Sequence, residues 1–274
     1  WDLYSQKSRP SGCLPVGTVL TIAAAGSEMS DSSVITNDMT WQKRGLSSDY
    51  SRCRFAVLNP ELTYTLPPYQ TACGCVDILM HTMERYFTTD KNTGLTDEIS
   101  EALMRTVLHN AKIVIDQPYD YTARAEIMWA GSLAHNGLTG CGRTGDWASH
   151  QLEHELSGMF DVAHGAGLAA IWSSWARYVY QTDAERFARF AVQVMGISEQ
   201  SQTQEELALE GISAMERFYH QIGMPVSISE LGVLLTEEQC RQLAYHCSFE
   251  GTRSIGGFRT LDQFDMEQIY KSAR

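Results

Sequence analysis

The pattern of hydrophobic and polar residues changes near Pro67 and Pro68. Before these prolines, three short runs rich in β-branched residues lie between turn residues, as is typical of short strands: VGTVLTIAA (16–24), SSVITN (32–37) and RFAVLN (54–59). After them, hydrophobic residues recur at helical spacing. The two prolines can begin a helix, because proline lacks the amide hydrogen that a first helical turn leaves unpaired. The pattern predicts sheet fragments followed by six or more helices.

Polar residues mark several of the predicted helix starts. Thr96, Asp120 and Thr236 each precede a helical stretch, and Thr236 is followed by Gln239 at the spacing of a capping box. Asp146 precedes the stretch WASHQLEHEL in the same way. We therefore interpret Asp146 as a helix N-cap rather than as a metal ligand.

Composition and charge narrow the classes of partner. The formal net charge is −12 and the isoelectric point is near 5.1, whereas nucleic acids and anionic membranes need a basic surface. The longest apolar runs, such as LAAIW, are far shorter than a membrane span, and no charged-then-apolar leader opens the chain. Seven scattered cysteines, an odd number, indicate reduced thiols. These features predict a cytoplasmic protein that acts on small molecules, with no nucleic-acid or membrane partner.

Two clusters carry candidate chemistry. Asp77 and His81 lie in GCVDILMHTMERYF, and His150, His154 and His164 lie in GDWASHQLEHELSGMFDVAHGAG. Residues four apart share one face of a helix, so Asp77 with His81, and His150 with His154, can hold one ion. One carboxylate with several imidazoles suits Fe²⁺, Zn²⁺ or Mn²⁺. The spacing alone also arises by chance, so these residues leave a structural role open.

A second interpretation of the same residues is a peptidase. The letters HQLEH, His150 to His154, match the H-x-x-E-H pattern of inverted zinc peptidases, in which the intervening Glu153 would activate water. That interpretation leaves Asp77, His81 and His164 without a role. A third interpretation is a non-catalytic fragment that retains the metal cluster.

The text around the clusters resembles the iron-containing, group III alcohol dehydrogenases, in particular their NAD(P)H-dependent, butanol-dehydrogenase-like branch. The resemblance is carried by TLPPYQTACGCVDILMHTMERYF and HNGLTGCGRTGDWASHQLEHELSGMFDVAHGAGLAAIW, and it extends from GTVLTIAAAGSEMSDSSVITND to the end of the chain. It implies a mainly α fold: an all-helical, metal-binding catalytic domain over residues 67–274, preceded by a remnant of an α/β dinucleotide-binding domain over residues 1–66.

The resemblance also assigns site residues and an activity. It implies a metal site of Asp77, His81, His150 and His164, and a proton-handling role for His154. Gly26 and Ser27 would contact the nicotinamide side of the cofactor. The implied reaction is hydride transfer between NAD(P)H and a small aldehyde or primary alcohol, with Fe²⁺, Zn²⁺ or Mn²⁺ as Lewis acid. A homodimer is a possible assembly.

The chain also departs from the family pattern. The family's Gly-Gly-Gly-Ser turn, which holds the cofactor pyrophosphate, does not occur in these residues. The first residues, WDLYSQ, resemble the part of the family sequence that comes just after that turn and its helix. Ala25 stands where the family usually has a threonine. We therefore expect these residues to bind metal but to turn over alcohols poorly. We also expect His135, Trp147 and Phe160 to line the pocket.

Overall fold

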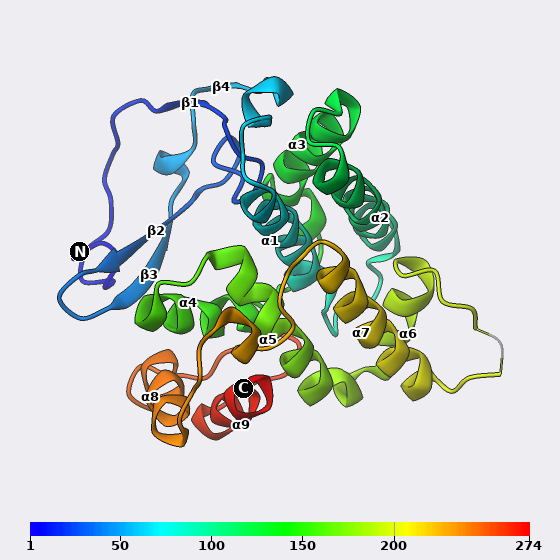
Figure 1. The fold of residues 1–274 in the computed structure, drawn as a ribbon. Helices are drawn as coiled ribbons and strands as arrows, with labels where there is room; N and C mark the ends of the chain where they lie inside the picture. Colours follow the sequence, from blue (N-terminus) through cyan, green and yellow to red (C-terminus); the bar gives the residue numbers. More distant parts are fainter. Residues whose placement is uncertain (200) are drawn as a thin grey trace.

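The computed structural model describes residues 1–199 and 201–274 and shows a mainly α-helical chain, as the sequence predicted (Figure 1). None of the described helices has the length and apolar character needed to cross a bilayer. The described residues form nine α-helices: α1 (Pro68–Tyr86), α2 (Gly94–Asp116), α3 (Tyr121–His135), α4 (Ala148–Phe160), α5 (His164–Val179), α6 (Ala184–Gln193), α7 (Gln204–Gln221), α8 (Glu237–Cys247) and α9 (Gln263–Ala273).

Four short strands precede the helices and form two separate pairs. Strands β1 (Gly17–Val19) and β4 (Phe55–Val57) are parallel, whereas β2 (Ser32–Asn37) and β3 (Gln42–Ser47) form an antiparallel hairpin. The β2 prediction is confirmed, and β1 and β4 are shorter than the predicted runs. The sequence analysis did not predict β3, because its polar sequence QKRGLS lacks the usual strand pattern and depends on pairing with β2.

Most predicted helix starts are confirmed, and two are corrected. Helix α1 begins at Pro68, Asp120 caps α3, and Thr236 forms a capping box at α8. Helix α2 begins earlier than predicted, at Gly94, and the Thr96 hydroxyl instead donates to the carbonyl of Cys141.

The second correction concerns the start of α4. Its N-cap is Trp147, one residue after the predicted Asp146. The Asp146 carboxylate still accepts a hydrogen bond from the amide of Ala148 at 3.0 Å, and its other oxygen accepts one from Phe258 at 2.8 Å. Asp146 therefore joins the start of α4 to a distant loop.

Helices α1 and α5 pack against each other in the middle of the helical part (Figure 1). Helix α1 also contacts α2 and α3, and α5 contacts α4, α7 and α9. An aromatic cluster lies beside the C-terminal end of α1, where Phe87 stacks on Phe187 with ring centroids 4.3 Å apart and packs on Trp175 at 5.7 Å. Phe87 and Phe187 are completely buried. The helices that carry the two histidine clusters are therefore embedded in a packed core.

We predict that Phe87→Ala lowers the free energy of unfolding by about 3–5 kcal/mol, because the change leaves a cavity in this aromatic cluster. Urea denaturation followed by circular dichroism would measure it. The matched control is Phe264→Ala, because Phe264 is 66% exposed. Equal effects of the two changes would contradict the prediction.

Candidate metal centre

Helix α1 contributes Asp77 and His81, which lie one turn apart. The Nε2 atom of His81 lies 3.5 Å from Oδ1 of Asp77. Asp77 is only 3% exposed, and its Oδ1 atom has no hydrogen-bond partner in the described residues. A buried carboxylate oxygen is costly without a partner, so this position needs a compensating positive charge.

Helices α4 and α5 bring two more imidazoles to the same oxygen. The Nε2 atoms of His150 and His164 each lie 3.7 Å from Asp77 Oδ1. Nitrogen atoms from three helices therefore surround one carboxylate oxygen. The structure thus places together the four residues that the family resemblance implies as ligands: Asp77, His81, His150 and His164.

A glycine allows α5 to approach α1 closely. A Cβ atom at Gly165, next to His164, would lie 2.1 Å from the carbonyl oxygen of Cys73 in α1. Any other residue would force the two helices apart at this point, because that oxygen belongs to the backbone. The contact of backbone with backbone brings His164 within reach of Asp77.

Two buried glutamates hold the outer nitrogens of these imidazoles. Glu84 Oε1 accepts a hydrogen bond from the His150 amide at 2.9 Å and lies 3.0 Å from His150 Nδ1. Glu153 Oε2 is hydrogen-bonded to His164 Nδ1. A neutral imidazole that donates from Nδ1 has its free lone pair on Nε2. Histidines that bind metals are commonly held in this way.

The distances from Asp77 Oδ1 to the three nitrogens suit a divalent cation. Ligand atoms about 2.1 Å from a tetrahedral ion lie roughly 3.4 Å from one another, and the three nitrogens lie 3.5–3.7 Å from Asp77 Oδ1. His150 Nε2, like Asp77 Oδ1, is buried without a hydrogen-bond partner in the described residues. Burial alone would lower the pKa of His150, but Asp77 and Glu84 raise that pKa to about 9, so without a cation a proton on Nε2 faces Asp77. A bound metal ion would take the place of that proton.

A second group of possible ligands, Glu153, His154 and His164, shares His164 with the proposed metal centre. Its carboxylate is already engaged, by His164 Nδ1 and by Lys43 Nζ at 3.7 Å. Burial alone would raise the pKa of Glu153, but His164, followed by Lys43, lowers that pKa to about 2. Glu153 therefore acts as a buried counter-charge.

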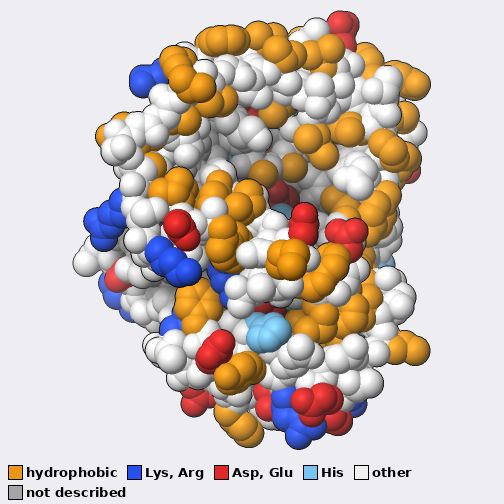
Figure 2. Space-filling view, turned by 90° about the vertical axis from the view of Figure 1, so that its left-hand side faces the viewer, with side chains coloured by type: hydrophobic (Ala, Val, Ile, Leu, Met, Phe, Trp, Pro, Cys, Tyr) orange, Lys and Arg blue, Asp and Glu red, His pale blue; other side chains and the backbone are white. Residues whose placement is uncertain are grey.

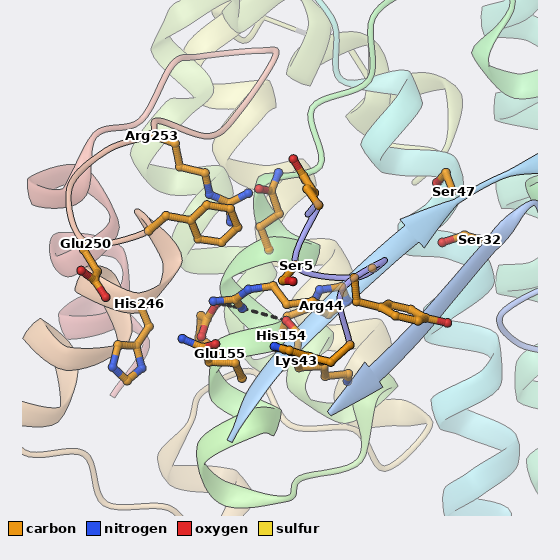
Figure 3. A pocket seen from close by; sticks show the side chains of 17 residues that line it. Ser5, Ser32, Lys43, Arg44, Ser47, His154, Glu155, His246, Glu250 and Arg253 are labelled. Carbon is orange, nitrogen blue, oxygen red and sulfur yellow. Dashed lines mark hydrogen bonds and ion pairs between the residues drawn. The ribbon is translucent and has the colours of Figure 1, made fainter. Parts of the chain in front are cut away.

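His154 lies one turn after His150 and faces a cleft of about 600 Å³ between the β2–β3 hairpin, α4 and α8. Its ring centroid lies 5.6 Å from that of His164. Burial lowers the pKa of His154 to about 3, so the imidazole is neutral near pH 7. Figure 3 shows Arg44 in the same cleft, paired with Glu155 at 2.7 Å. In Figure 2 this side of the molecule is hollowed, and hydrophobic side chains surround the hollow.

The predicted cofactor residues lie on a turn between β1 and β2. Gly26 is buried with φ of +61°, and a Cβ atom there would lie 2.2 Å from Cγ of His135. His135 in turn packs on His81, with ring centroids 4.0 Å apart. Gly26 is therefore separated from the candidate centre by one imidazole, whereas Ser27 is exposed.

The structure also places the predicted pocket residues. Burial lowers the pKa of His135, although Asp77 opposes this change. Trp147 lies beside the centre, with its ring 5.6 Å from that of His81, whereas Phe160 packs against the hydrophobic core. The sequence analysis missed Glu84, although it follows Asp77 by seven residues and therefore shares its helical face.

Comparison with known proteins supports the resemblance. Residues 71–274 match the family model of the C-terminal part of the Fe-containing alcohol dehydrogenases, and residues 1–60 match the iron-containing alcohol dehydrogenase model. The chain is 37% identical over 273 residues to a probable NADH-dependent butanol dehydrogenase of Bacillus subtilis, and these residues cover 100% of the chain and 70% of that protein. It is 36% identical to the NADPH-dependent aldehyde reductase YqhD of Escherichia coli, covering 95% of the chain and 66% of the reductase.

A solved structure agrees with these sequence matches. The NADH-dependent butanol dehydrogenase A of Thermotoga maritima superposes with a TM-score of 0.93 at 36% identity, over 100% of this chain and 69% of that protein. The chain thus spans about 70% of the length of these relatives. The two family models, the identity to several relatives and the shared fold show that this chain belongs to the iron-containing alcohol dehydrogenase family.

Proposed function

We propose that this protein is a metal-dependent alcohol dehydrogenase that transfers a hydride between NAD(P)H and a small aldehyde or primary alcohol. The observation that carries the proposal is the arrangement of His81, His150 and His164 around Asp77 Oδ1 in a chain of this family. The names of the relatives, butanol dehydrogenases and an aldehyde reductase, support a small aldehyde as substrate.

The four residues would hold Fe²⁺, Zn²⁺ or Mn²⁺, which suit one carboxylate and three imidazoles. When bound, the cation supplies Lewis-acid polarisation of an aldehyde or alcohol oxygen, and the nicotinamide supplies or accepts the hydride. Glu84 and Glu153 keep the His150 and His164 rings oriented with Nε2 inwards.

His154 is the residue that we propose moves the alcohol proton. It lies one helical turn from His150, and it lines the cleft that opens to solvent. A neutral imidazole in this position can accept a hydrogen bond and pass a proton to water. The family resemblance implies that Gly26 and Ser27 border the nicotinamide. Their turn packs against the face of His135, which in turn packs on His81.

Two other functions are less well supported by the geometry. A peptidase would use Glu153 as its base, but Glu153 is completely buried and bonded to His164 Nδ1. We expect no metal-dependent peptide cleavage, and cleavage that survives His81→Ala would contradict our proposal. A non-catalytic metal-binding protein would use the same four ligands, and aldehyde reduction distinguishes it from an enzyme.

We also propose a cytoplasmic location and a homodimeric assembly. The location rests on the scattered, unpaired cysteines, and the described structure leaves all seven unpaired. The assembly rests on the family resemblance alone. Size-exclusion chromatography with light scattering would measure the assembly.

We predict one divalent ion per chain, bound through the four proposed ligands. Removing a hydrogen-bond partner of a metal ligand costs about 10–100-fold in affinity, so Asp77→Asn or His164→Ala should cost more than about 100-fold. Metal analysis and calorimetry with Zn²⁺ and Fe²⁺ would measure this loss. His109→Ala is the control, because His109 is exposed on α2. Unchanged metal affinity in both ligand variants would contradict the assignment.

We predict that Glu84→Gln weakens metal binding about 10–100-fold while leaving the helical content unchanged, because the carboxylate orients His150 without being a ligand. The same calorimetric titration measures the effect. Glu98→Gln removes an acid of the same kind from an exposed position and should have no effect. Equal metal affinity in Glu84→Gln and the wild type would show that His150 needs no such support.

We predict that His154→Gln lowers the rate of butanal reduction about 10²–10⁴-fold without changing the metal content, as expected for loss of a group that passes a proton between water and the reacting oxygen. The rate should be measured as oxidation of NADH and of NADPH, at high cofactor concentration because we expect weak turnover. His109→Gln controls for loss of a histidine elsewhere. Loss of metal in His154→Gln would instead assign this residue to the ligands.

A further inference from the structure

His135 presents a buried, unused hydrogen-bond acceptor next to the metal centre. Its ring packs on that of His81, and the side chain is only 5% exposed. The Nδ1 atom lies 2.7 Å from the carbonyl oxygen of Gly131, which can only accept, so Nδ1 carries the proton. In the neutral imidazole Nε2 is then an acceptor, and it has no partner in the described residues.

Glu28 provides a second such acceptor beside the first. Its Oε1 atom accepts a hydrogen bond from Ser132 at 2.7 Å, whereas Oε2 is buried without a partner in the described part of the chain. Ser132 and His135 are three residues apart on α3 and therefore share one helical face. The turn at Gly26 presses against the His135 ring and keeps Glu28 on that face.

Two neighbouring buried acceptors indicate a missing donor. Buried polar atoms in native proteins are almost always hydrogen-bonded to protein, water or ligand. Neither His135 nor Glu28 is one of the four proposed metal ligands, and neither belongs to the two groups of possible ligands found among the described residues. Because His135 packs on His81 and Glu28 is bonded to Ser132 on the same face of α3, the pair lies beside the proposed metal centre.

We propose that His135 and Glu28 form a polar subsite that accepts hydrogen bonds from a donor group of a bound molecule. This inference rests on the proposed function. Two molecules of the reaction offer such a donor: a substrate with a second hydroxyl near the reacting carbon, or the carboxamide N–H of the nicotinamide. The subsite would therefore discriminate between ligands by one hydroxyl or one N–H group.

Binding of matched ligand pairs to the metal-loaded protein tests the subsite without relying on turnover. Calorimetry would compare propane-1,2-diol with propan-1-ol, and NAD⁺ with its 3-acetylpyridine analogue, which lacks the amide N–H. In the wild type we expect the donor-bearing member of one pair to bind about tenfold more tightly, the effect of roughly one hydrogen bond. His135→Leu should abolish that preference. The ratio of affinities within the other ligand pair should stay unchanged.

Further variants separate recognition from folding. His135→Gln restores an acceptor near the position of Nε2 and should restore part of the preference, whereas His109→Leu should leave the preference intact. Glu28→Gln conserves the side-chain shape and tests the second acceptor even if His135→Leu fails to fold. Loss of the diol preference assigns the donor to the substrate, and loss of the NAD⁺ preference assigns it to the cofactor.

The proposal is overturned if the ratio of affinities within each ligand pair is the same in the wild type, His135→Leu and Glu28→Gln. A buried water would then be the donor to both acceptors. Failure of the proposed function gives a different result. In that case the protein binds metal and reduces no aldehyde, while the ligand ratios still report on His135 and Glu28.

Discussion

A carboxylate that is buried away from water must be matched by positive charge, and Asp77 imposes that requirement on the centre of this molecule. Two further buried acids, Glu84 and Glu153, hold the imidazoles that surround it. Two cationic side chains lie near this group in the described structure: Lys43 Nζ is 3.7 Å from Glu153, and the charge of Arg85 acts on Glu84. A divalent ion would add the positive charge that Asp77 lacks. The arrangement of acids and imidazoles is therefore costly without a cation and stable with one.

The β2–β3 hairpin is held against α4 by two basic residues of β3, Lys43 and Arg44. Lys43 in β3 donates to Ser157 in α4 at 2.9 Å, and the adjacent Arg44 pairs with Glu155. The acids that these two residues face in α4, Glu153 and Glu155, are almost fully buried. Solvent and salt therefore screen the Lys43–Glu153 and Arg44–Glu155 pairs less than they screen ion pairs on the surface. The hairpin that forms one wall of the cleft is thus fixed relative to His154 by contacts with the helix that carries it.

Several parts of this structure follow from local sequence, and others depend on contacts that local sequence does not reveal. Pro68 and Asp120 mark helix starts because their effect is confined to one helical turn. Thr96 and Asp146 gave wrong positions because their side chains are used by distant partners, the carbonyl of Cys141 and the amide of Phe258.

Strand β3 likewise depends on pairing with β2. The grouping of the site residues came from the family resemblance, since spacing could join Asp77 only to His81 and not to His150 or His164. The role of Glu84 became clear only when its distance to His150 was known. The predicted domain boundary after residue 66 stays a prediction, although α1 begins two residues later, at Pro68.

The close contact at Gly165 has a consequence for how the protein is made. The proposed ligands lie on α1, α4 and α5, so a growing chain presents Asp77 and His81 well before His164 has been synthesised. Two ligands hold a divalent ion weakly, and the backbone of α5 must first settle against Cys73 before the fourth ligand is in place. Metal capture would therefore come late, and the ion would then act as a cross-link between three helices whose stabilising effect grows with the logarithm of the free metal concentration.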